Sequence, residues 1–109
     1  MIDWKHFESV EIRCGTVIQA ETFPEARKPA IKLWIDFGEF GIKKSSAQIT
    51  ELYDPQSLLK QQVIAVLNFP PKQIGPFISE CLVLGVLGND SGISLLKPDY
   101  PVKNGLRIG

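Results

Sequence analysis

The sequence predicts an all-β fold, a small closed barrel with short helices, and three observations support this prediction. Short apolar runs recur along the 109 residues and are separated by segments rich in turn-forming residues. The 9 glycines and 8 prolines are spread over the whole chain, as in a protein with many tight connections. Only two short segments carry helix-start signals. Because this length suits one hydrophobic core, residues 1–109 are expected to form a single domain.

The first part of the chain predicts a short helix followed by a bent strand. Asp3 can cap a helix over residues 4–9, because its carboxylate can accept amide protons of the first turn. Residues 10–21 alternate apolar and polar side chains until Gly15 interrupts them, which is typical of a strand with a β-bulge. A loop is expected over residues 23–29, because its two prolines cannot donate to a β-ladder.

The second strand has the clearest pattern. Over residues 31–37 apolar side chains alternate strictly with polar or amphipathic ones, so one face should be core and the other solvent-exposed. Gly38 and Gly41 bracket a turn. Residues 42–49 are then expected to return as a third strand with a polar face, paired with the second as a hairpin.

The rest of the chain predicts one more helix and further strands. Asp54 followed by Pro55 is an N-cap with proline at the first helical position, which predicts a short helix ending near Lys60. Residues 62–69 are apolar on both faces, so the outer face should be covered. A helix between strands three and four favours a five-stranded OB-fold β-barrel with short helices and added terminal segments. Further strands are expected at residues 79–87 and 93–96. The tail, residues 102–108, has a turn signal at Asn104-Gly105 and is expected to contain one last short strand.

Composition and charge exclude several classes of protein. Twelve Lys and Arg balance twelve Asp and Glu, so nucleic-acid binding would need a local basic patch. No apolar run approaches the roughly 20 residues of a bilayer span and no secretory leader is evident, so we expect a cytoplasmic protein without membrane insertion. Cys14 and Cys81 lie far apart in apolar runs and are expected to be free, buried thiols. We therefore expect no metal and no cofactor.

No motif for catalysis is present in the sequence. His6 is the single histidine, and no serine or cysteine nucleophile motif accompanies it. The phosphate-binding, dinucleotide-binding and zinc-protease motifs are also missing. We therefore expect a binding protein and not an enzyme.

Two surfaces are candidates for ligand binding. OB-fold barrels bind ligands on the face of the second and third strands, where cations follow phosphates and aromatic rings stack on bases. The segment 68–79, with three prolines and two aromatics, predicts either the rigid lip of a cleft or a buried arch that completes the core. The alternative for the strand face is a plain solvated surface. The candidates from these patterns are Lys32, Lys43, Lys44 and Ser46 for nucleic acid and Trp34, Phe69 and Phe77 for peptide.

Three stretches of the chain together match a known pattern. They are Ile12-Arg-Cys-Gly-Thr-Val17 with Ala20-Glu21 and Pro24-Glu-Ala26, then residues 63–68, then Ser79-Glu80. They resemble the tRNA-binding-domain family, whose OB-folds are related to the C-terminal domain of bacterial methionyl-tRNA synthetase. Within it, residues 24–33, 45–49, 68–71 and 79–80 are most similar to the CsaA branch, export-related chaperones of bacteria. The resemblance covers nearly the whole chain.

The resemblance implies a homodimer that binds unfolded or presecretory polypeptides and contacts the secretion ATPase SecA. It also implies tRNA binding, with Asn68 and Ser79 at the positions of the family's Asn and Ser. The family's usual Ser-x-Gly-Met stands here as Ser-Glu-Cys-Leu, and of the basic residues before it only Lys72 remains. Each lost cation removes a phosphate contact, so the tRNA role ranks second. The apolar Ile78 and Leu82 favour an extended hydrophobic peptide.

The dimer interface is expected at the two ends of the chain. The N-terminal helix offers Trp4 and Phe7, and the C-terminal segment 98–108 is the second candidate. Strands that are apolar on both faces, at residues 63–67 and 82–87, also need a cover on their outer side.

Overall fold

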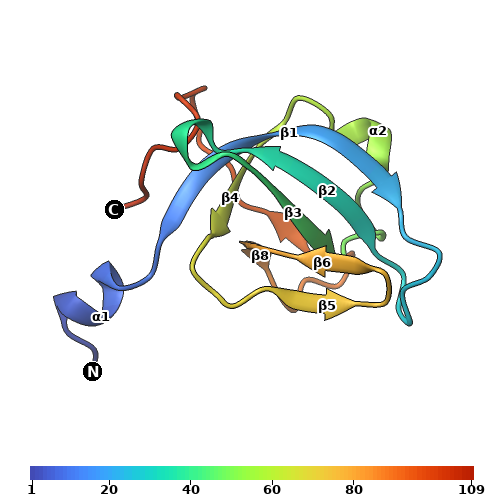
Figure 1. Cartoon of the computed structure of the whole chain (residues 1–109), viewed down its shortest axis with the longest axis horizontal. Coiled ribbons are helices and arrows are strands. Elements are labelled where there is room, and N and C mark those ends of the chain that lie inside the picture. Colours follow the sequence, from blue (N-terminus) through green and yellow to red (C-terminus); the bar gives the residue numbers. More distant parts are fainter.

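A five-stranded antiparallel sheet forms a nearly closed barrel in the computed structural model, which describes residues 1–109 (Figure 1). Its strand order is β3-β2-β1-β4-β7. The predicted all-β OB-fold barrel is confirmed. The barrel strands are β1 (Ile12–Thr22), β2 (Ile31–Asp36), β3 (Ile42–Ala47), β4 (Gln62–Val66) and β7 (Leu82–Val83).

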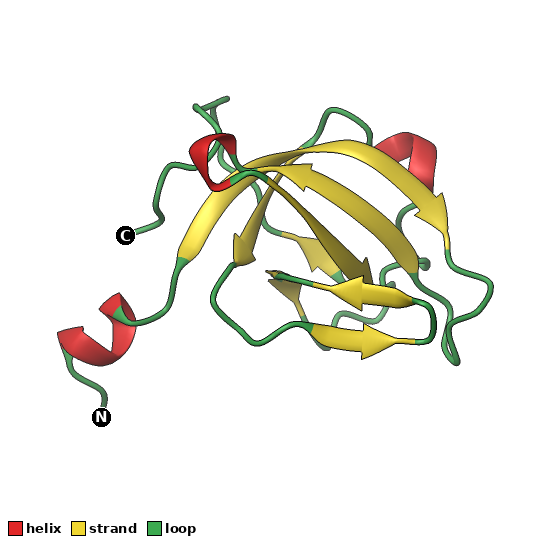
Figure 2. Cartoon of the chain, viewed as in Figure 1, coloured by secondary structure: helices red, strands yellow, loops and turns green.

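Two short hairpins and three helical turns complete the fold (Figure 2). The hairpin of β5 (Lys72–Ile74) and β6 (Phe77–Ser79) crosses in front of the barrel, and β8 (Gly85–Val86) pairs with β9 (Ser94–Leu95). The helices are α1 (Trp4–Glu8), the 3-10 turn η1 (Gly38–Phe40) and α2 (Pro55–Leu58). None of these helices has the length and apolar character that a membrane crossing requires.

As predicted, the side chains of β2 alternate between the two faces of the strand, and one face lies in the barrel core. Leu33 and Ile35 are fully buried and pack with apolar side chains of β1 and β4. The opposite face of β2 is not solvent-exposed, contrary to the expectation. Lys32 and Trp34 on that face are half-buried, because the β5–β6 hairpin packs over them.

The irregularity of β1 lies further along the strand than predicted. The register with β2 shifts between Val17 and Gln19, so the β-bulge is not at Gly15. Gly15 instead allows close packing, since a Cβ there would come within 2.6 Å of the Phe37 ring.

The prediction of one continuous strand at residues 79–87 is wrong. The segment is divided among β6, β7 and β8, each only two or three residues long. The chain leaves the hairpin at Glu80, whose N–H donates to the carbonyl of Lys44 at 2.7 Å, and then enters the barrel at β7. The expected C-terminal strand is a single bridge between Arg13 and Arg107, with the tail running along β1.

Both predicted N-caps are confirmed. The Asp3 carboxylate accepts from His6 N at 3.1 Å, and the Asp54 carboxylate accepts from Ser57 N at 2.8 Å. The two helices differ in their packing. Leu58 of α2 is buried against the barrel, whereas α1 projects away from the barrel and buries none of its residues (Figure 1).

Candidate functional site

A groove of about 1090 Å³ lies beside the β5–β6 hairpin. Four segments line it: the loop at residues 25–30, the end of β3, the hairpin with the residues before it, and residues 79–82. The loop of residues 23–29 was predicted as a connection only, yet it forms one wall. Concave surfaces with apolar walls and a few polar groups are the usual sites of ligand binding.

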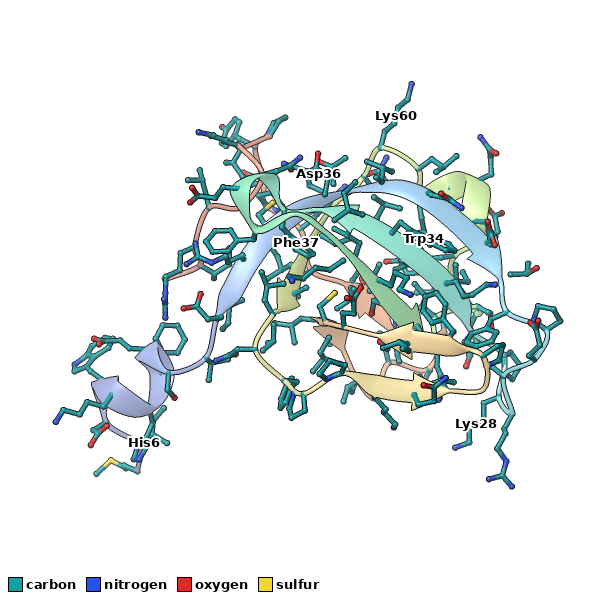
Figure 3. All side chains as sticks on the ribbon, in the orientation of Figure 1. His6, Lys28, Trp34, Asp36, Phe37 and Lys60 are labelled. Atoms are coloured by element: carbon teal, nitrogen blue, oxygen red, sulfur yellow. The ribbon has the colours of Figure 1, made fainter.

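An aromatic cluster attaches the hairpin to the barrel. The Phe77 ring is 7% exposed and meets Phe23 and Trp34 edge-on, with centroid distances of 5.5 and 5.7 Å. The Nζ atom of Lys44 lies 5.2 Å from the Phe77 ring centroid, a cation–π distance. Figure 3 shows Trp34 on β2 beside the hairpin. The hairpin is therefore seated on the face of β2 and β3 where OB-fold barrels bind ligands.

The local sequence explains why the chain turns back at this point. Ile74 pairs with Phe77 on either side of the dipeptide Gly75-Pro76. Gly75 has a φ of +55°, which the first central residue of a type II′ turn requires and which glycine adopts without strain. The hairpin thus follows from turn chemistry, and its position follows from Phe77.

Side-chain hydrogen bonds close the barrel next to the groove. Lys44 N donates to the Glu80 carboxylate at 3.0 Å, and Ser46 N donates to the Ser79 hydroxyl at 3.2 Å. The buried Ser45 hydroxyl donates to the Cys81 carbonyl at 2.9 Å. Residues 79–81 therefore join β3 partly through side chains and not through a regular ladder.

The predicted nucleic-acid residues do not form one patch. Ser46, Lys72 and Ser79 line the groove, whereas Lys32 and Lys44 lie beside the Phe77 ring. The Lys32 ammonium is also 3.5 Å from the Glu21 carboxylate.

Lys43 and Asn68 lie away from both places. Lys43 pairs with Ile35, whose side chain faces the barrel interior, so Lys43 is on the opposite face of β3 from Lys44. Asn68 uses both ends of its amide to hold the N-terminal segment: Oδ1 accepts from Glu11 N at 3.0 Å, and Nδ2 donates to Ser9 O at 2.7 Å.

Of the residues predicted to bind peptide, some line the groove and others attach the hairpin to the barrel. Phe69 and Leu82 are 55% and 48% exposed and line the groove. The Phe77 ring, on the hairpin itself, contacts Trp34 of β2, so these two residues attach the hairpin to the barrel. Ile78 is 41% exposed, and its register opposite Gln73 puts its side chain on the other face of the hairpin from Phe77.

The groove has charged residues that the sequence patterns did not single out. Arg27 and Lys28 belong to its loop wall, and Lys28 extends outward from the molecule (Figure 3). Glu25 and Glu80 also line it. Two adjacent cations between prolines were a visible signal, but only the folded chain brings this loop close to Lys72. The lining thus mixes both signs of charge with exposed apolar side chains.

Cys81 lies at the groove with a thiol that burial keeps protonated. Its side chain is 6% exposed, and burial raises its pKa from 9.0 to about 12. Burial also raises the pKa of Cys14. No group of three or more His, Cys, Asp or Glu side chains is placed to hold a metal ion.

The raised thiol pKa gives a test of burial. At pH 8 we expect both cysteines to react very slowly with a disulfide reagent in the folded protein and rapidly in urea. Because the Cys81 pKa is higher in the folded state, its stabilising contribution is present below pH 9 and is lost as the pH rises from 9.0 toward about 12. The decline should be smaller in Cys81→Ala. Rapid modification of the folded protein at pH 8 would contradict the burial.

Comparison with known proteins adds the family. The sequence pattern of the family described as "Putative tRNA binding domain" matches residues 12–107. The chain belongs to the tRNA-binding-domain family. Within this family it is of the CsaA type: the crystal structure of the chaperone CsaA from Bacillus anthracis is 50% identical, with a TM-score of 0.94 over 100% of this chain and 99% of that one. CsaA from Picrophilus torridus is 47% identical, with a TM-score of 0.93 and full coverage of both chains.

The family also includes parts of much larger proteins. The methionine–tRNA ligase of Bdellovibrio bacteriovorus is 32% identical over 107 residues, which are 98% of this chain and 15% of that protein. This tRNA-binding-domain protein therefore spans about one seventh of the length of that curated relative. Both kinds of relative match this chain over nearly its whole length.

Proposed function

We propose that this tRNA-binding-domain protein is a non-catalytic, chaperone-like binder that holds unfolded or presecretory polypeptide segments in the groove. The exposure of Phe69 and Leu82 on the groove walls carries the proposal. Large apolar side chains that remain in water are stabilised when a ligand covers them. The high similarity to CsaA chaperones supports the same activity.

The mixed charge of the groove supports a tolerant binding site. Arg27, Lys28 and Lys72 supply cations, and Glu25 and Glu80 supply carboxylates. Both signs of charge on a peptide can therefore find a partner near the apolar walls. Because exposed ion pairs contribute little, most of the affinity would come from apolar burial.

A paired titration tests the proposal. The purified protein is titrated with a fluorescein-labelled presecretory peptide and, separately, with bulk tRNA, each at low and near-physiological salt. We expect peptide binding that changes little with salt, together with suppressed aggregation of a chemically denatured client. A protein that binds no peptide and suppresses no aggregation would refute the chaperone proposal.

tRNA binding is the second candidate function. The cations Arg27, Lys28 and Lys72 on the groove, together with the family membership, favour it. We expect Lys28→Glu with Lys72→Glu to weaken tRNA binding and to reduce the salt slope by about 2, because each phosphate contact contributes about 0.9. Lys43→Glu, on the other face of β3, is the matched control. An unchanged slope in the double variant would contradict a tRNA site at this groove.

We also propose a homodimer that works in the cytoplasm and contacts SecA, as the family resemblance implies. The unsupported helix α1 favours association, since Trp4 is 78% and Ile2 75% exposed. With Phe7 and Gly109 they line a hollow of about 520 Å³. Burial of these side chains by a second copy would stabilise α1. Sedimentation showing a monomer at micromolar concentration would contradict the dimer.

A further inference from the structure

One edge of β3 is incompletely paired. The pairing with β2 leaves the N–H and C=O groups of alternate residues, Lys44 and Ser46, on the other edge of the strand. The Glu80 N–H donates to the Lys44 carbonyl, and the Glu80 carboxylate accepts from the Lys44 N–H. The Ser79 hydroxyl accepts from the Ser46 N–H. One step further along, neither the backbone N–H nor the backbone C=O of Gln48 forms a hydrogen bond within the chain. An unused donor and acceptor therefore remain at the end of this edge.

This free edge lies at the groove. Ser46 and Gln48 are both lining residues, and they share the groove with the exposed Phe69 and Leu82. The hairpin does not continue the β3 edge past Ser46, because Phe77 draws β6 across the outer face of the barrel toward Trp34. The space beside Gln48 therefore stays open to a ligand.

We propose that a bound polypeptide segment adds to the Gln48 end of β3 as an extended strand. The inference rests on the proposed polypeptide binding and names its mode. An extended backbone offers the carbonyl and N–H that complement those of Gln48, and such pairing serves any sequence. Alternate side chains of the segment then point to the apolar wall at Phe69 and Leu82 or to solvent. Main-chain pairing would let one groove accept many unfolded clients.

The protein side of the pairing is tested by Gln48→Pro, with Gln48→Ala as the matched control. Proline removes the Gln48 N–H, which donates no hydrogen bond within the chain. The preceding residue, Ala47, lies in β3 and so already has the extended conformation that a residue before proline prefers. Proline is also tolerated at the edge of a sheet. Alanine removes the side chain but keeps the N–H. We expect Gln48→Pro to bind a fluorescein-labelled, apolar presecretory peptide about 5- to 10-fold more weakly than Gln48→Ala, the effect of one hydrogen bond.

The peptide side is tested without changing the protein. Variants of the same peptide carry one N-methyl group each, at successive positions of a segment about eight residues long. Because strand pairing uses alternate amides, we expect affinity to fall at every second position of the paired stretch. Uniform insensitivity to N-methylation, or equal affinity of the proline and alanine variants, would overturn the strand-addition mode while polypeptide binding stands. Failure of the unmodified peptide to bind would overturn the proposed function and this inference with it.

Discussion

Phe77→Ala will lower the free energy of unfolding by about 3 kcal/mol, within the range for a buried phenylalanine in a well-packed site. The ring is 7% exposed and contacts Phe23, Trp34 and the Lys44 ammonium, so its removal leaves a cavity where the hairpin meets the barrel. The loss of these contacts should also release the hairpin from the barrel. Urea unfolding followed by far-ultraviolet circular dichroism measures the stability.

Ile78→Ala is the control for this prediction. Ile78 neighbours Phe77 on the same short strand, but it is 41% exposed and points to the other face of the hairpin. We expect its replacement to cost less than about 1 kcal/mol, as for a partly exposed side chain. Equal losses in the two variants would show that Phe77 does not hold the hairpin in place.

Replacing Phe69 and Leu82 together with alanine will weaken peptide binding about 30-fold or more. Each side chain should contribute roughly 1 kcal/mol or more when a ligand covers it, and a tenfold change corresponds to about 1.4 kcal/mol. Both side chains are exposed in the free protein, so the free energy of unfolding should change little. Fluorescence anisotropy with the labelled presecretory peptide measures the affinity.

The matched control changes two apolar side chains of similar exposure outside the groove. Ile18 and Leu52 are 47% and 43% exposed, and neither lines it. We expect Ile18→Ala with Leu52→Ala to bind the peptide with unchanged affinity. Equal weakening by both double variants would indicate that the peptide binds without preference for the groove.

Local patterns predicted the parts of the fold whose causes are local. The caps at Asp3 and Asp54 depend on a carboxylate near the first-turn amides of the same helix. The inward face of β2 depends on the two-residue period of a strand. These causes act over a few residues, so they can be recognised before the chain is folded.

The same patterns failed where the outcome depends on segments far apart in the chain. The outer face of β2 looked solvent-exposed because nothing near it in sequence reveals that Phe77 covers Trp34. Residues 79–87 looked like one strand because their apolar run does not reveal the hydrogen bonds of Glu80 with Lys44. A change of direction caused by a distant partner leaves no local signal.

The residues of the candidate site show the same contrast between local causes and contacts of distant segments. By itself the sequence determined the all-β barrel and the family, because apolar periodicity, turn residues and motif identity can be recognised along the chain. It named Phe69 and Leu82 among the candidates for peptide binding but did not determine which candidates line a groove. Only the tertiary structure decided that Lys43 lies apart from Lys44, that Phe77 is a support, and that residues 25–30 form a wall of the groove. The physical reason is that a groove is made by surfaces of separate segments. Their relative positions are set by packing of the whole barrel and not by the residues that line it.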